Sequence, residues 1–230
     1  PTALPRLRDA LAERLATRLR EAGLEPGAPE AFATPRRLGV LFPDVPAQQP
    51  DQLQERRGPA VAAAFDAAGE PTRAVLGFAR SCGVELQALD RAEKDGVEKL
   101  VYRATRAGQS ATELLPGIIQ QALAKLPIPR RMRWGSSREE FVRPVYWVLM
   151  LLGDTPVDCN ILGIQADRIT YGHRFHHPEA ITLQQPADYE QALQAAHVIA
   201  DYEKRKQQIR AQVEAEGRAL GAHAVIEEDL

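Results

Sequence analysis

Leucine spacing in the first two dozen residues is the feature that most constrains how this chain folds. The repeat consists of Leu4, Leu7, Leu11, Leu15 and Leu19. Intervals of three and four residues place all five side chains on one face of a helix. Gly23 stands where helices commonly end in a left-handed residue, and the apolar Leu24 follows it. The pattern therefore predicts an amphipathic helix that ends near Gly23.

Shorter apolar segments and further helical ones follow without regular alternation. Residues 38–42 predict a strand that Pro43 ends, and the polar residues 47–60 predict a loop. The segment PTRAVLGFARSCGV at 71–84 predicts a short helix that stops at Gly83, and residues 97–105 predict a strand.

The second half of the chain continues this mixture of elements. Ser110 and Glu113 have the spacing of a capping box, which predicts a helix from there to about Leu126. Two apolar runs about Gly153 favour a buried hairpin, although both a strand and a helix fit the uniform run at 145–152. The remaining expected elements are a helix at 186–196 capped by Asp188, a brief strand at 197–200 and a long polar helix opened by Asp201.

This order of elements predicts an α+β fold. We expect a mixed sheet with amphipathic helices, a hairpin at about 141–165 and a long C-terminal helix. The proline-rich break after Leu126 suggests a division into subdomains 1–127 and 128–230. Because the chain begins PTALP, without methionine, and stops at AVIEEDL, we expect it to be a piece of a longer protein.

Composition narrows the classes of partner. With a formal net charge of -2 and 44% hydrophobic residues, the chain is not polybasic, so attraction for nucleic acid requires local clusters of positive charge. Of its 29 basic residues 24 are arginines, whose guanidinium groups bind phosphate in a bidentate manner. Cys82 and Cys159 are far apart, which indicates neither a disulfide framework nor a zinc knuckle and fits the cytoplasm. No apolar run is long enough to span a membrane.

The segment YGHRFHHP at 171–178 carries three of the five histidines. His173, His176 and His177 have a spacing that can hold zinc, but Gly172, Pro178 and the cation Arg174 oppose a metal site. The other two interpretations stay open at this point. One is a turn whose histidines make structural hydrogen bonds, and the other is a surface that contacts phosphates and stacks on bases.

A second candidate is the segment IPRRMRWGSS at 128–137. Its arginines lie beside the aromatic plane of Trp134, which suits phosphate contact but also suits a solvated domain edge. The arginine pairs at 36–37 and 56–57 stand beside turn residues and have the same two interpretations. Phosphate-binding glycine loops, dinucleotide fingerprints and nucleophile elbows are absent from the sequence, so it predicts no catalytic residue.

Five blocks of sequence, in order, resemble the N-terminal part of one protein family, the β subunit of the bacterial heterotetrameric glycyl-tRNA synthetase. The blocks are ATPRRL, RRGPAVAAAFDAAGEPTRAVLGFARSCGV, LPIPRRMRWG, FVRPVYWVLMLLGD, and ILGI with YGHRFHHP and VIADYEKRK. The resemblance implies that the α subunit holds the class II adenylation site for glycine and ATP. It also implies that the β subunit supplies tRNA-binding domains, of which the HD-like and anticodon-binding ones lie beyond this chain.

The resemblance implies a function in protein biosynthesis. This region would be a tRNA-binding and subunit-organising module of glycine-tRNA ligase, a cytoplasmic aminoacyl-tRNA synthetase, with ATP and Mg bound through the α subunit. The implied partners are glycine tRNA, the α subunit and a second β subunit, with no membrane and no DNA. The alternatives are an editing hydrolase module of the B3/4 type that uses His173 or His176, and a purely structural scaffold for the α subunit.

Together, the arginine clusters and the resemblance predict ten tRNA-binding residues, with no metal ligand among them. These are Arg36, Arg37, Arg130, Arg131, Arg133, Trp134, Arg143, His173, Arg174 and His176.

Overall fold

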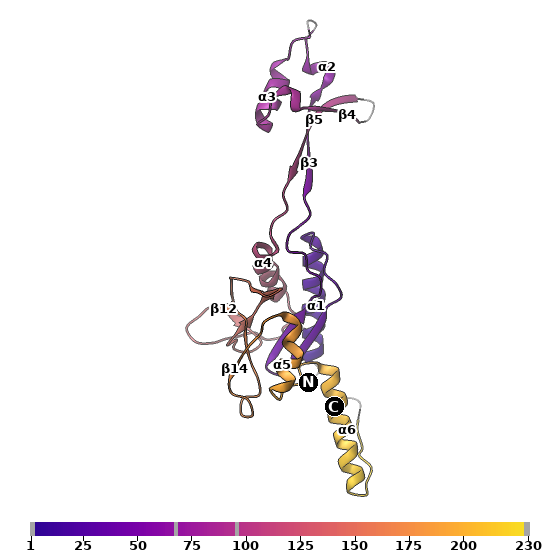
Figure 1. The fold of residues 1–230 in the computed structure, drawn as a ribbon, viewed down its shortest axis with the longest axis vertical. Coiled ribbons are helices and arrows are strands. Elements are labelled where there is room, and N and C mark those ends of the chain that lie inside the picture. Colours follow the sequence, from indigo (N-terminus) through magenta and orange to yellow (C-terminus); the bar gives the residue numbers. More distant parts are fainter. Residues whose placement is uncertain (1–2, 67–68, 95–96, 228–230) are drawn as a thin grey trace. The chain divides into compact units, whose positions relative to one another are not determined.

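The computed structural model describes residues 3–66, 69–94 and 97–227, and the chain forms two compact units (Figure 1). The first unit combines Pro1–Gln49 with Gln109–Leu230, and the second consists of Pro50–Gly108. The boundary that we expect at 127/128 lies inside the first unit. Helices and strands occur in both units, which confirms the α+β class.

The first unit opens with α1 (Ala3–Glu21), the amphipathic helix predicted from its leucine spacing, and the leucine face is buried. Gly23, with φ at 71°, ends the helix. Its N–H donates to the carbonyl of Arg20, and the N–H of Leu24 donates to the carbonyl of Leu19, both at 2.8 Å. This pair of bonds forms a Schellman motif, in which a glycine avoids the strain that a Cβ would cause.

The helix α4 (Ala111–Ala124) packs against α1. Its N-cap is the predicted one, because the hydroxyl of Ser110 accepts a hydrogen bond from the N–H of Glu113 at 3.3 Å. Burial of each leucine in the core that the two helices share contributes about 2 kcal/mol. That core includes Leu11, Leu15, Leu19, Leu24, Ile118, Ala122 and Leu126.

A tight hairpin follows α1. Strands β1 (Glu30–Thr34) and β2 (Arg37–Leu41) are antiparallel, and the second confirms the strand expected at 38–42. The pairing of Thr34 with Arg37 leaves only Pro35 and Arg36 in the turn, where both are exposed. The hairpin therefore presents Arg36 at its tip.

Residues 132–182 form short strands rather than one continuous sheet. Gly153, with φ at 59°, turns the hairpin between β9 and β10, so the predicted hairpin is confirmed and the run at 145–152 contains strands, not a helix. Strand β12 pairs parallel with β8 and antiparallel with β11, which is a mixed sheet. The strands are β6 (Met132–Arg133), β7 (Glu140–Phe141), β8 (Val148–Leu149), β9 (Leu151–Leu152), β10 (Thr155–Pro156), β11 (Asn160–Ile161), β12 (Ile164–Asp167), β13 (Ile169–Tyr171) and β14 (Ala180–Thr182).

Two helices complete the first unit: α5 (Tyr189–Ala195), preceded by the 3₁₀ turn Pro186–Asp188, and α6 (Tyr202–Ala219). The predicted side-chain cap at Asp188 is wrong, because its carboxylate accepts a hydrogen bond from the side chain of Gln185 and not from the backbone of α5. The carboxylate of Asp201 caps α6 as predicted, accepting from the N–H of Lys204 at 2.9 Å. Among the described residues, no helix has both the length and the apolar character needed to cross a membrane.

The strand expected at 197–200 is wrong. His197 adopts a φ of 60° after the end of α5, and the backbone that follows is irregular. Val198 and Ala200 pack against the buried Leu193 of α5 and Phe32 of β1 instead of joining a sheet. The apolar pattern of this segment thus reflects burial in a core and not strand pairing.

The second unit is an antiparallel sheet of strand order β3-β5-β4 with helices beside it (Figure 1). The loop expected at 47–60 is wrong, because residues 52–60 form β3. The first six residues of β3 are all exposed, so no buried face produces the alternation that marks a strand in a sequence. The helix stop at Gly83 is confirmed, with φ at 70°. The elements are β3 (Gln52–Ala60), α2 (Val61–Ala64), α3 (Arg73–Cys82), the 3₁₀ turn Leu86–Ala88, β4 (Asp90–Lys94) and β5 (Val97–Arg106).

Candidate nucleic-acid interface

The histidine loop, residues 172–178, lies against the β1–β2 hairpin. Arg37, the first residue of β2, donates from Nη2 to the carbonyls of Tyr171 and Gly172, the latter at 2.8 Å. Because one guanidinium serves two consecutive carbonyls, the hairpin fixes the start of the loop. Residues 135 positions apart in the sequence thereby form one site.

Gly172 lets the loop approach the end of α5. A Cβ at this position would lie 2.5 Å from Cβ of Ala196 and 2.9 Å from its carbonyl oxygen. The next residue uses the same close approach, because the N–H of His173 donates to the Ala196 carbonyl at 2.9 Å. Any larger residue would push the loop away from the helix end.

His173 is an internal support of the loop. Its Nδ1 accepts hydrogen bonds from the N–H groups of Phe175 and His176, at 3.2 and 3.3 Å. Partial burial lowers the pKa of His173 below its ordinary value of 6.5, and the nearby His176, His197 and arginines lower it further. The ring is therefore neutral at neutral pH and carries its proton on Nε2. Nδ1 is already occupied by two donors, so it cannot act as a base.

Three imidazole rings lie together at this point. The ring of His176 is centred 4.5 Å from that of His173 and 5.6 Å from that of His197. His197 comes from the irregular segment after α5, where its left-handed backbone turns it toward the loop. The sequence analysis missed His197, because nothing near it in the chain marks a site.

Exposed aromatic and cationic side chains lie at the histidine loop and the tip of the β1–β2 hairpin. The ring of Phe175 is 80% exposed. Arg36 and Arg174 are exposed as well, and their guanidinium groups form no hydrogen bond or ion pair with any described residue. We call the group the histidine–arginine surface, and it consists of Arg36, His173, Arg174, Phe175, His176 and His197.

The aromatic rings of Trp147 and Tyr171 pack near Arg37. Its guanidinium lies 5.6 Å from the centre of the Trp147 ring, and that ring meets Tyr171 edge to face at 5.2 Å. Burial lowers the pKa of Arg37, but arginine stays charged throughout the physiological range. Trp147 lies in an apolar run, and the sequence analysis did not identify it as part of the site. An aromatic residue at such a position is also typical of a core, so the sequence carried no clear signal for it.

Two arginines of the segment at 130–143 have internal partners. Arg131 donates to the carbonyl of Ala124 at 2.8 Å and so caps the end of α4. Arg133 forms an ion pair with Glu140 at 2.6 Å. Arg130 and Arg143 are exposed, and Trp134 is half-buried. Among the described residues, no hydrogen bond, ion pair or ring contact connects this segment to the histidine–arginine surface.

The arginine pair in β3 also points to internal partners. Arg57 pairs with Glu55 at 3.1 Å, and Arg56 donates to the carbonyl of Ser81 at 2.8 Å. Hydrogen bonds from Arg57 and Arg103 lower the pKa of the Glu55 carboxyl. This pair therefore belongs to the structure of the second unit.

A search of the described residues finds no group of three or more histidine, cysteine or acidic side chains placed to hold a metal ion. The carboxylate that lies near the histidine loop is Glu179, with its Oε2 at 3.7 Å from Nδ1 of His177. That contact is longer than a hydrogen bond.

Sequence comparisons identify the class of protein. A family model described as "Glycyl-tRNA synthetase beta subunit" matches residues 1–230. The glycine-tRNA ligase beta subunit of Hahella chejuensis is 49% identical over 231 residues, which cover 100% of this chain and 33% of the relative. Those of Marinobacter nauticus and Azotobacter vinelandii are 46% and 47% identical, again over the whole chain and about a third of the relative.

These relatives are subunits of an aminoacyl-tRNA synthetase. The chain belongs to the glycyl-tRNA synthetase beta subunit family. It spans about a third of the length of the curated relatives that it matches.

Proposed function

We propose that this chain is part of a glycine-tRNA ligase, in which it binds glycine tRNA and helps to organise the subunits, without an adenylation site of its own. Glycine, ATP and Mg would bind to the α subunit, and a second β subunit would complete a cytoplasmic heterotetramer. The family membership supports the ligase, and the name of the relatives, "beta subunit", supports an assembly with other chains.

The histidine–arginine surface carries the tRNA-binding part of the proposal. Free guanidinium groups at Arg36 and Arg174 suit phosphates, whose neutralisation releases counterions and supplies much of the affinity for RNA. The exposed face of Phe175 and the neighbouring imidazoles suit unstacked bases. A chain with a net charge of -2 needs such a local concentration of cations and stacking faces to bind a polyanion.

The test is tRNA binding by the full-length chain in complex with its partner subunit, measured across a salt series. With Arg36→Gln and Arg174→Gln combined, we expect affinity for glycine tRNA to fall about tenfold at low salt. The slope of log affinity against log salt should become shallower by about 0.7–0.9 for each lost phosphate contact. The matched control is Arg6→Gln, an exposed arginine on α1.

Two results would contradict the proposal. One is unchanged affinity and slope in the double variant, and the other is an equal loss in the Arg6→Gln control. In either case the histidine loop would be a structural turn only.

A further inference from the structure

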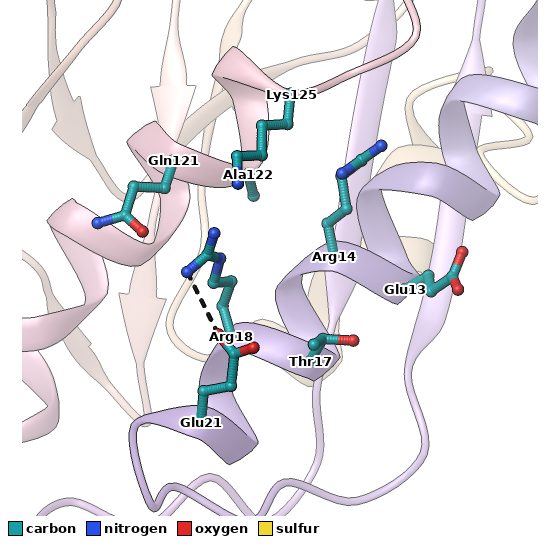
Figure 2. Close-up of a pocket in the computed structure, with 8 residues that line it drawn as sticks. All are labelled: Glu13, Arg14, Thr17, Arg18, Glu21, Gln121, Ala122 and Lys125. Carbon is teal, nitrogen blue, oxygen red and sulfur yellow. Dashed lines mark hydrogen bonds and ion pairs between the residues drawn. The ribbon is translucent and has the colours of Figure 1, made fainter.

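A polar groove of about 250 Å³ lies between α1 and α4 (Figure 2). Its α1 side carries Arg14, Thr17 and Arg18, and its α4 side carries Gln121 and Lys125. None of these residues belongs to the histidine–arginine surface or to the ten predicted tRNA-binding residues. The leucine core that joins the two helices lies beneath it and holds their spacing fixed.

Positive charge in this groove is only partly compensated. Arg18 pairs with Glu21 at 3.2 Å. By contrast, the side chains of Arg14 and Lys125 form no hydrogen bond or ion pair with any residue in the described part of the chain. The other carboxylate beside the groove, Glu13, has no ion pair among the described residues either. Figure 2 shows the Arg18 side chain extending from α1 toward α4, while the Arg14 side chain extends along α1.

Arg14 brings a buried donor to the groove. Its Nε is buried and has no hydrogen-bond partner among the described residues. A buried hydrogen-bond donor on a charged group destabilises the fold when no acceptor binds it. An anion that accepts hydrogen bonds from the remaining guanidinium nitrogens would offset the charge, because charge-assisted bonds to arginine are among the strong ones.

The placement of the cations favours phosphate over a carboxylate. Cationic side chains line the groove from both helices, Arg14 and Arg18 from α1 and Lys125 from α4. A carboxylate presents its two oxygens in one plane, whereas a phosphate directs oxygens tetrahedrally and can accept from both sides at once. We propose that the α1–α4 groove binds a phosphate group, held by Arg14 of α1 and Lys125 of α4. The same chemistry belongs to free phosphate compounds and to an RNA backbone.

The first experiment uses inorganic phosphate and pyrophosphate as probes on the full-length chain, with sodium chloride at matched ionic strength as reference. A ligand that binds only the folded state raises Tm by an amount that grows with the ratio of its concentration to its Kd, and titration calorimetry gives the affinity directly. Arg14→Gln and Lys125→Gln should each weaken phosphate binding about tenfold, since each removes a charged contact. Arg20→Gln, an exposed arginine of the same helix outside the groove, should leave binding unchanged.

A gain-of-affinity variant separates lost binding from lost folding. Glu21→Gln removes the partner of Arg18 and should tighten phosphate binding about threefold. If phosphate and pyrophosphate bind no better than chloride, or if Arg14→Gln and Lys125→Gln bind them as tightly as the parent chain, the proposal is overturned.

A second arm identifies the source of the phosphate; it rests on the tRNA binding proposed above, which the variant that combines Arg36→Gln and Arg174→Gln tests separately. If the same two variants also bind glycine tRNA more weakly, while Arg20→Gln does not, the groove contacts the RNA backbone. If tRNA binding stays unchanged while phosphate binding falls, the groove serves a free phosphate compound.

Discussion

Two arginine-rich regions of the first unit each divide their charges between internal partners and solvent. At the histidine–arginine surface, Arg36 and Arg174 are exposed without a partner among the described residues, while Arg37 binds the carbonyls of the loop. In the segment at 130–143, Arg131 caps α4 and Arg133 is paired with Glu140, whereas Arg130 and Arg143 are exposed. Within a run of arginines, a guanidinium therefore contributes to a cationic surface only where the fold supplies no internal acceptor for it.

The largest effect is expected at Gly172, where the histidine loop packs closely against Ala196. Gly172→Ala places a Cβ against Ala196, so the loop must move, and overpacking of this kind costs about 1–3 kcal/mol. Urea unfolding of the full-length chain measures the loss, and tRNA affinity should fall with it. Gly117→Ala is the matched control, because its Cβ would meet nothing within 4 Å in the interior of α4, and it should stabilise by about 0.5–1 kcal/mol. Equal behaviour of the two variants would contradict the role of Gly172.

The next largest effect is expected at Arg37, which supports the histidine loop, in contrast to the exposed Arg36. Arg37→Lys keeps the charge but loses the shared contact with two carbonyls and the contact of the guanidinium with the Trp147 ring. We expect a loss of about 1–2 kcal/mol in the free energy of unfolding. Arg36→Lys, one residue away and exposed, should change stability by less than about 0.5 kcal/mol. If both substitutions have the same effect, the two arginines do not differ as described.

A smaller effect is expected when Arg133, in the segment at 130–143, loses its internal partner. Glu140→Gln removes the charge that neutralises Arg133. If internal partners decide which guanidinium groups contribute to a cationic surface, glycine tRNA should bind about threefold more tightly at low salt, with a steeper salt slope. Glu25→Gln makes the same change in net charge at an exposed position of the first unit and serves as the control. An identical gain in both variants would point to net charge alone.

The smallest effect concerns pH. The pKa of His173 is lowered in the folded chain, mainly by burial, so the unfolded chain binds the proton more readily. Its contribution to stability is fully present above about pH 6.5 and is lost as the pH falls toward the lowered pKa. Amide exchange in the histidine loop should therefore become faster as the pH is lowered through that window, after correction for intrinsic rates.

A single substitution checks the assignment of this pH dependence. His173→Asn keeps an acceptor for the two backbone N–H groups but does not titrate, and it should flatten the pH dependence. His223→Asn, outside the histidine–arginine surface, should leave it as it is. Persistence of the pH dependence in His173→Asn would assign it to another group.

Patterns of residues close together in the sequence predicted most helices of the first unit. Helix α1, the cap at Ser110, the cap at Asp201 and the turn at Gly153 depend on residues close together in the chain, and all four predictions are confirmed. Strand β3 was missed because its exposed side chains obey no periodicity, and its pairing with β5 lies about fifty positions away. The supposed strand at 197–200 failed for the opposite reason, since apolar residues can serve a core without pairing.

The candidate site also combines features that the sequence predicted with contacts that it did not predict. The histidine loop, the arginine pair at 36–37 and the resemblance to the family were present in the sequence. The contacts of Arg37 with Tyr171 and Trp147, and the position of His197 beside His176, were not. No interval along the chain indicates such contacts, because they join segments that meet only after folding.

By itself, the sequence determined which segments form capped amphipathic helices, where the tight turns lie, and to which family the chain is similar. These properties depend on residues within a few positions of one another, whose geometry is fixed by backbone and side-chain sterics. The tertiary structure decided which arginines are free. Whether a guanidinium stays exposed or meets a carbonyl or carboxylate depends on which distant segment packs beside it, as Arg36 and Arg37 show from adjacent positions.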